Sequence, residues 1–340
     1  MESLTDRQKQ VLEGVISEYT RSAEPVGSRT LSRKYLRLSP ATVRNVLADL
    51  EEMGLLSQPH TSAGRVPTER AYRTYIDGMM EVHPLTLREQ DRIRAGLESS
   101  LHEGADLMRR TSHLLSAFSS QVGLVVAPRL DEAGLKRVEL VRAGRGRVMA
   151  VIISDRPLVQ HRIVETQTDP TQAELDRMSQ ALNGILSGLN LRQVRARIEQ
   201  EMRSDKAGYD RMLTAALRLG RDAMVGIGDS DLYVEEPARI LDQPEFLDLE
   251  RMKSLFRAFE EKSRILRLLD AMIEAEGVRV VIGSALESAG MRGCSLIASR
   301  YTTGPRATGS LGVIGPTRMN YPRVIPVVEY VARLVSEYLN

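Results

Sequence analysis

The stretch SPATVRNVLADLEEMGLLSQPHTSAGRVPTERAYR, residues 39–73, decides the fold of the N-terminal part of this chain. Ser39 followed by Pro40 is a typical helix start, because the serine can cap free N–H groups and proline at the first helical position loses no hydrogen bond. Apolar residues then recur at helical spacing as far as Met53, and Gly54 is suited to end a helix. One amphipathic helix is therefore expected here.

Two short apolar pieces follow this helix and bracket a polar loop. The segments LLSQ (55–58) and RVP (65–67) are too short for helices, but they can pair as two strands around PHTSAG. Upstream, one helix is expected to open with a capping box between Thr5 and Gln8, and a second is expected to start at Ser28. The order helix, helix, turn, helix, hairpin predicts a winged helix-turn-helix, which binds DNA.

Basic residues are concentrated around this module. The 340-residue chain has a net charge of only +2, whereas residues 21–45 contain six basic residues and one acidic residue, a local net charge of +5. Such a stretch indicates a surface for nucleic acid, although a solvated helix face would have the same charge. The absence of Trp and the presence of only four Phe argue against an aromatic platform for single strands.

The phase of the helix after Ser39 determines which side chains can enter a major groove. With the apolar positions inside, Ala41, Thr42 and Ala48 face outward together with Arg44 and Asn45. Arginine can donate two hydrogen bonds to a guanine edge, and asparagine can pair with adenine. The small alanines would let the backbone approach the bases. The alternative for Arg44 and Asn45 is ordinary solvated helix surface.

Residues outside this helix complete the expected interface. Ser28 and Arg29 start the preceding helix, where N–H groups and a cation can hold a phosphate. The loop tip HTSAGR would bring hydroxyl groups and Arg65 to the DNA backbone or minor groove, and Gly64 would permit the turn. For His60, a structural role is equally compatible with the sequence. The expected DNA-contacting residues are Ser28, Arg29, Ser39, Ala41, Thr42, Arg44, Asn45, Ala48, His60, Thr61, Ser62 and Arg65.

Beyond the winged helix, strand patterns alternate with helical ones. Strands are expected from 121 to about 165 and again over 278–317, with helices between them. One α+β domain with an inserted helical domain is the economical interpretation, because two consecutive domains would each leave sheet edges open. Two consecutive domains remain the alternative. The expected division is 1–80 winged helix, 81–118 helical connector, 119–168 plus 277–340 sheet domain, and 169–276 inserted domain.

No pattern typical of an enzyme or a metal site stands out. The five histidines are scattered, and the single Cys294 excludes an intrachain disulfide and a cysteine-based metal cluster. GRGRV and GSLGVIGPTRM are rich in glycine but do not match a phosphate-binding loop. No apolar run has the length of a membrane span, and the N-terminus lacks a secretion signal. A cytoplasmic, non-enzymatic protein without metal or cofactor is expected.

Three segments carry a resemblance to a known family: PVGSRTL (25–31), the block 39–77, and GVIGPTRMNYPRVIPVVEYVA (312–332). They resemble the HrcA family of heat-inducible transcription repressors, over essentially the whole chain. The resemblance implies a winged helix, a GAF-like domain and an inserted dimerising domain. It also implies repression of chaperone operons through an inverted repeat called CIRCE, and an activity tuned by the GroE chaperonin, which helps the repressor reach its active fold.

An inverted repeat requires a two-fold protein, so a homodimer is expected, with its surface on the Leu- and Met-rich insertion. The alternative function is a winged-helix regulator whose GAF-like domain binds a small effector. Val, Ile, Leu and Gly dominate that domain, which favours control through the chaperonin. An enzyme on the α+β domain has no catalytic constellation behind it. One departure from the family pattern is Pro326, because of which the last helix is expected to begin near Ile325.

Overall fold

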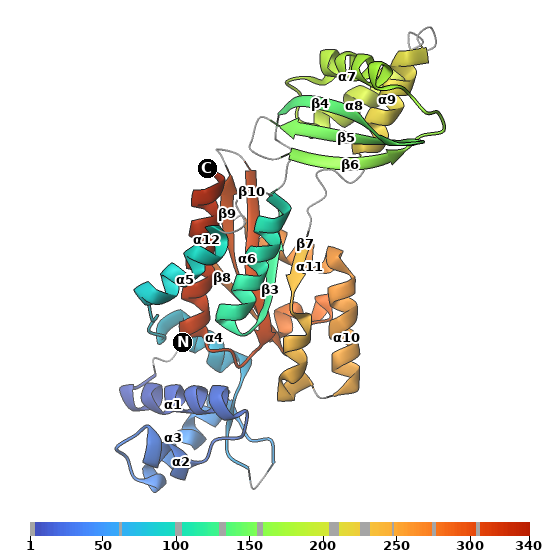
Figure 1. Ribbon diagram of the computed structural model, residues 1–340. Helices are drawn as coiled ribbons and strands as arrows, with labels where there is room; N and C mark the ends of the chain where they lie inside the picture. Colours follow the sequence, from blue (N-terminus) through green and yellow to red (C-terminus); the bar gives the residue numbers. More distant parts are fainter. Residues whose placement is uncertain are drawn as a thin grey trace.

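The computed structural model describes residues 4–60, 63–98, 104–128, 134–154, 159–203, 211–224, 232–246, 248–273, 277–303 and 307–340. Figure 1 shows an elongated molecule in which three groups of elements follow one another. A winged helix lies at one end, a five-stranded sheet with helices on both faces lies in the middle, and a three-stranded sheet with its own helices lies at the other end. The mixed α and β character agrees with the sequence-based expectation.

The N-terminal group has the predicted order of elements. Its elements are α1 (Asp6–Ser22), α2 (Ser28–Lys34), α3 (Pro40–Glu52), β1 (Leu56–Ser57), β2 (Val66–Pro67) and α4 (Glu69–Gly78). Thr5 and Gln8 form the expected capping box, and the Ser39 hydroxyl accepts the Thr42 N–H at 3.1 Å. Gly54, with a φ of +71°, follows α3 in the left-handed region that glycine tolerates. The winged helix-turn-helix is therefore confirmed.

Gly64 is needed for a reason other than the expected turn. Val26 and Arg65 exchange two backbone hydrogen bonds, of 2.8 and 2.9 Å, which join the hairpin to the segment before α2. A Cβ atom on Gly64 would lie 2.5 Å from the carbonyl carbon and oxygen of Val26. Glycine is required because two backbones meet here, and only a residue without a side chain leaves them room.

A buried carboxylate holds α1 against α2. Glu18 is 6% exposed and accepts hydrogen bonds from Arg21 at 2.6 Å, Lys34 at 2.8 Å and the Tyr35 hydroxyl at 2.8 Å. The hydrogen bond from Lys34 contributes most to lowering the pKa of this carboxyl from 4.5 to about 2, with Tyr35 and Arg21 adding to it against the opposing effect of burial. Two of the six basic residues counted in the sequence are thus engaged inside the domain.

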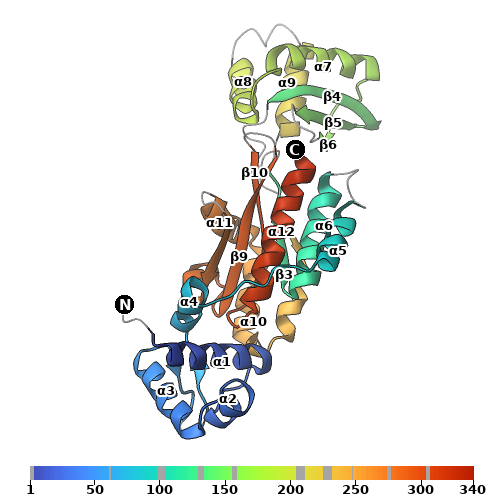
Figure 2. The ribbon, with the colours of Figure 1, turned by 90° about the vertical axis from the view of Figure 1, so that its left-hand side faces the viewer.

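The middle group is an antiparallel sheet of order β7-β3-β10-β9-β8. Its strands are β3 (Val122–Val126), β7 (Leu232–Glu235), β8 (Val278–Ile282), β9 (Cys294–Thr303) and β10 (Ala307–Pro316). The helices on one face are α6 (Gly104–Ser119) and α12 (Tyr321–Leu339), with α5 (Leu87–Glu98) packed on both (Figure 2). The expectation that 81–118 is a connector is wrong, because α6 packs directly on β3 and shares its core.

The opposite face of this sheet is covered by the segment between β7 and β9. It contains η2 (Pro237–Asp242), η3 (Pro244–Phe246), α10 (Leu249–Glu260), α11 (Lys262–Ile273) and η4 (Gly283–Ala289). Apolar side chains of α10 and α11, among them Leu255, Ile265 and Leu269, form one core with Leu296 and Ile314 of the sheet. These helices therefore belong to the sheet domain and not to an inserted domain.

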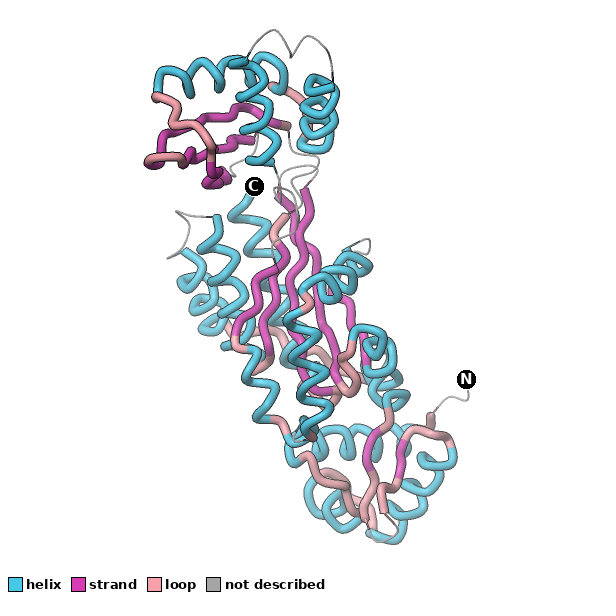
Figure 3. The backbone as a smooth tube through the Cα atoms, turned by 90° about the vertical axis from the view of Figure 1, so that its right-hand side faces the viewer, coloured by secondary structure: helices cyan, strands magenta, loops and turns pink. Residues whose placement is uncertain are grey.

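The last group has its own sheet and its own core (Figure 3). Its elements are β4 (Leu135–Gly144), β5 (Arg147–Ser154), β6 (Val159–Glu165), α7 (Gln172–Leu186), α8 (Leu191–Arg203) and α9 (Arg211–Met224). The assignment of 119–168 to the same sheet as 277–340 is wrong, because β4, β5 and β6 pair only with one another among the described strands. An insertion between β3 and β7 is present, but it spans about 134–224 instead of 169–276.

Side chains of α7 cover the free edge of β4. Asn183 binds both the N–H and the carbonyl of Val138, at 2.7 and 2.9 Å. Ser179 accepts the Leu140 N–H at 3.0 Å, and the amide of Gln172 donates to the Leu140 carbonyl at 3.0 Å. An edge strand presents a row of unpaired backbone groups, and here a helix supplies their partners.

The start of α12 differs from the sequence-based expectation. The helix begins at Tyr321 and contains Pro326 in its second turn. Proline at this position cannot donate to the carbonyl four residues earlier, and that carbonyl, of Pro322, instead accepts the His83 N–H at 3.3 Å. The proline is tolerated because a backbone group from another segment takes the place of the missing donor. No helix among the described residues is long and apolar enough to span a membrane.

Glu18→Gln is expected to lower the free energy of unfolding by about 1–3 kcal/mol at neutral pH, because a charged acceptor of three hydrogen bonds becomes a neutral one. A carboxyl whose pKa is depressed on folding stabilises the protein above its unfolded value of 4.5, and this contribution is lost as pH falls through about 2. Denaturation of parent and variant between pH 7 and 3 should therefore show a difference that shrinks below pH 4.5. The exposed Glu13→Gln is the matched control, and a difference independent of pH would contradict this assignment.

Gly64→Ala is expected to destabilise the hairpin by about 1–3 kcal/mol, because its Cβ atom would overlap the Val26 backbone. Gly78→Ala is the control, since a Cβ atom there meets nothing within 4 Å and the position lies in the last turn of α4. Thermal unfolding followed by circular dichroism compares the two. Equal midpoints for both variants would show that the hairpin does not need this close approach.

Candidate nucleic-acid interface

The second half of the helix-turn-helix, α3, presents one face to solvent. Ala41, Arg44, Asn45 and Ala48 are exposed, whereas Val43, Val46, Leu47 and Leu50 are buried on the opposite face. The outward face predicted from helical phase is thus the one that the structure exposes. It combines a bidentate donor, an amide and two small side chains, which is the chemistry that reads base edges in a major groove.

Two expected contact residues at the start of α3 are engaged with each other. The Ser39 and Thr42 hydroxyls are 2.8 Å apart, and the Ser39 hydroxyl also caps the Thr42 N–H. Ser39 is exposed and Thr42 is half-buried. The cap fixes the N-terminal turn of α3, so both residues contribute to the geometry of this helix end.

Several arginines of α2 and of the turn after it are exposed. Arg29 lies in the first turn of α2, next to the half-buried Ser28, and Arg33 and Arg37 are exposed farther along the same segment. The charge count in the sequence included Arg33 and Arg37, but no motif singled them out as contacts. Four of the six basic residues counted in the sequence, Arg44 included, are therefore exposed in the helix-turn-helix without an ion pair to Glu18, whereas Arg21 and Lys34 are engaged with Glu18.

The hairpin is held to α3 by an ion pair that the sequence did not indicate. Arg65 donates through Nε and Nη2 to Glu51, both at 2.8 Å, and its side chain is 20% exposed. Glu51 lies at the end of α3, so this ion pair ties the hairpin to α3. The two backbone hydrogen bonds between Val26 and Arg65 tie the same part of the hairpin to the segment before α2. Arg65 therefore has a structural partner in the DNA-free chain, and its contact with DNA stays a prediction.

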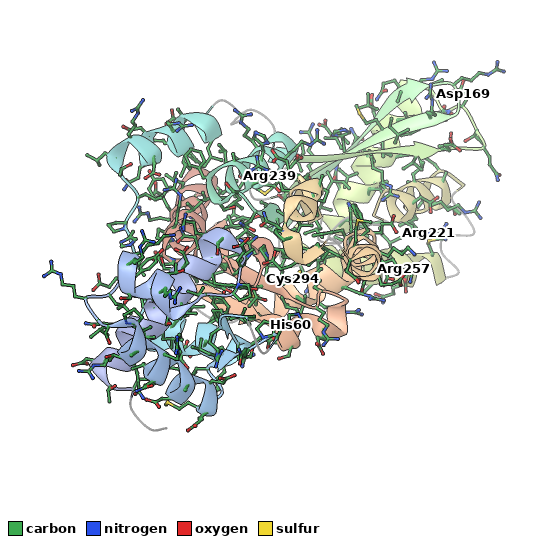
Figure 4. All side chains as sticks on the ribbon, turned by 90° about the horizontal axis from the view of Figure 1, so that it is seen from below. His60, Asp169, Arg221, Arg239, Arg257 and Cys294 are labelled. Carbon is green, nitrogen blue, oxygen red and sulfur yellow. The ribbon has the colours of Figure 1, made fainter. Side chains whose placement is uncertain are left out.

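The tip of the hairpin is only partly described. His60 is exposed, and its carbonyl accepts the Ala63 N–H at 2.8 Å. Thr61 and Ser62 lie outside the described residues. In Figure 4 the labelled His60 lies far from Asp169, which belongs to the unit with the three-stranded sheet β4-β5-β6. Among the described residues, no three His, Cys, Asp or Glu side chains come together in a group that could hold a metal ion.

Comparison with known proteins agrees with this geometry. Residues 3–78 match the family described as "Winged helix-turn-helix transcription repressor, HrcA DNA-binding", and residues 105–325 match the "HrcA protein C terminal domain". The heat-inducible transcription repressor HrcA of Geobacter sulfurreducens is 45% identical over 341 residues, covering 100% of this chain and 99% of the relative. The protein of the same name from Syntrophobacter fumaroxidans is 43% identical, with 100% and 99% covered.

A solved structure of a hypothetical protein has the same fold, with a TM-score of 0.71, 23% identity and 99% of both chains covered. The family match includes both the winged helix and most of the remaining chain, and the relatives are named as repressors of transcription and not as enzymes. The chain belongs to the HrcA family of heat-inducible transcription repressors, and its N-terminal winged helix is a DNA-binding domain.

Proposed function

We propose that this repressor reads an inverted-repeat operator with α3 in the major groove of each half-site. The observation that carries the proposal is the exposed face of α3, where Arg44 and Asn45 lie beside two alanines. Ser39 and Thr42 set the helix end, and Ser28 and Arg29 contact phosphate. His60, Thr61, Ser62 and Arg65 belong to the hairpin that reaches the DNA backbone or the minor groove.

The operator is proposed to be a CIRCE-type repeat in front of chaperone operons, and the activity is proposed to depend on the GroE chaperonin. Support comes from the full-length resemblance to the family. The place of action is the cytoplasm, where a bacterial operator lies.

The repeat requires a homodimer, and the contacts between the two protomers are proposed to lie in the outer unit, residues 134–224. Ile163 on the edge strand β6 is 56% exposed there, and this unit lies at the far end from the winged helix (Figure 1).

The function is tested by fluorescence anisotropy with a CIRCE-type duplex and a scrambled duplex at two salt concentrations. Arg44→Ala should weaken binding to the repeat by about 1–3 kcal/mol and reduce its preference over the scrambled duplex, because a bidentate base contact is lost. Arg88→Ala, an equal loss of charge at an exposed position of α5, should change neither. Equal and steeply salt-dependent binding of the parent to both duplexes would mean phosphate contacts alone and would contradict sequence readout.

Glu51→Gln tests whether Arg65 is available to DNA. Loss of the carboxylate releases the guanidinium, so binding should strengthen, and the slope of log K against log salt should become steeper by about 0.9, the value for one additional phosphate. In the Arg65→Ala background the same substitution should leave the slope unchanged. A slope that changes equally in both backgrounds would show that Arg65 does not make the contact.

A further inference from the structure

The winged helix is joined to the sheet domain by packed aromatic rings. Tyr72 of α4 and Tyr321 of α12 are buried, with ring centroids 5.9 Å apart and an interplanar angle of 51°. The Tyr321 hydroxyl bonds to the Ser295 hydroxyl at 2.9 Å and to the Thr317 carbonyl at 2.8 Å. Buried residues of α1, α3 and α4 therefore continue into the core of the sheet domain without a break.

A carboxylate at the start of α4 forms the second contact. Both oxygens of Glu69 lie 3.0 Å from the Ser284 backbone nitrogen, which donates to them. Gly283 precedes it with a φ of +56°, and a Cβ atom there would lie 1.9 Å from the Glu69 carboxylate. The glycine thus leaves room for the carboxylate, and α4 is tied to η4 at a defined point.

Arg318 forms the third contact and joins three segments. Its guanidinium donates to the Thr20 carbonyl at 2.9 Å, to the Gln243 side chain at 2.8 Å and to the Glu245 carboxylate. The side chain is only 11% exposed. Thr20 lies in the last turn of α1, where carbonyls lack helical partners and a cation is favoured. One buried cation therefore holds the end of α1 against the sheet domain.

These contacts fix the direction of the DNA-reading helix relative to the rest of the chain. They act on α1 and α4, which pack with α3 in one core. The chain after α4 is also anchored, since the His83 N–H binds the Pro322 carbonyl. In a two-fold dimer, the orientation of each winged helix on its sheet domain sets the distance between the two α3 helices. That distance in turn sets the spacing of the two half-sites that the dimer can bind together.

We propose that Glu69 and Arg318 determine the half-site spacing that this repressor accepts. They are positioning residues that do not touch DNA. The inference rests on the proposed binding of a dimer to an inverted repeat. A winged helix on a flexible tether would accept many spacings, because each winged helix could reorient to reach its half-site. With a rigid junction, both winged helices bind at once only when the distance between the half-sites matches the distance between the two α3 helices.

The test uses the full-length protein with Arg318→Met and, as matched control, Arg323→Met. Arg323 lies in the first turn of α12, five residues after Arg318. Its side chain is 55% exposed and pairs with Glu89 of α5, which belongs to the sheet domain. Binding is measured on inverted repeats whose spacer is lengthened or shortened one base pair at a time, and on a duplex with a single half-site. Glu69→Ala repeats the measurement through the other contact.

The parent and Arg323→Met should prefer one spacing by about tenfold or more. Arg318→Met and Glu69→Ala should bind the single half-site as the parent does, and this also shows that their winged helix is folded. Both should lose about tenfold on the preferred repeat and show a flatter dependence on spacing. An unchanged preference in these variants, or a parent without any preference, would overturn the proposal. Failure of the parent to distinguish the repeat from a scrambled duplex would instead count against the proposed function.

Discussion

The contact between Tyr72 and Tyr321 is the constraint on which the arrangement of this chain depends. It carries the hydrophobic core of the winged helix into the sheet domain, so that Leu50 of α3 and Val331 of α12 belong to one cluster of buried residues. Each fully buried aromatic ring contributes about 1.5–3 kcal/mol through the hydrophobic effect. Arg318 lies near these rings with a side chain that is only 11% exposed, and its guanidinium keeps hydrogen-bond acceptors in the Thr20 carbonyl and the Gln243 side chain.

Local chemistry predicted the elements of this fold better than their partners. Thr5 and Ser39 start helices as expected, because a cap depends on a few adjacent residues. The strand patterns over 121–165 were also correct. Their division between two sheets was not predictable, because alternation of apolar residues tells which face of a strand is buried but not which strand pairs with it. The label GAF-like for the middle domain stays a prediction.

The candidate site shows the same limit. Helical phase was sufficient to predict the exposed face of α3, since the apolar stripe defines its opposite side. The pair between Glu51 and Arg65 was missed because it joins residues 14 positions apart across a hairpin whose path the sequence does not specify. Pro326 was misjudged for a similar reason, because the backbone donor that replaces its own comes from His83, on a distant segment.

The covering of β4 by α7 has a consequence for the fate of the chain when it unfolds. Gln172, Ser179 and Asn183 lie on one helix, so undocking α7 removes all their hydrogen bonds to the strand together. The edge then uncovered would be a template for strand pairing between molecules. Partial melting of the outer unit would therefore favour aggregation over refolding, and its reversibility would depend on protein concentration as well as on temperature.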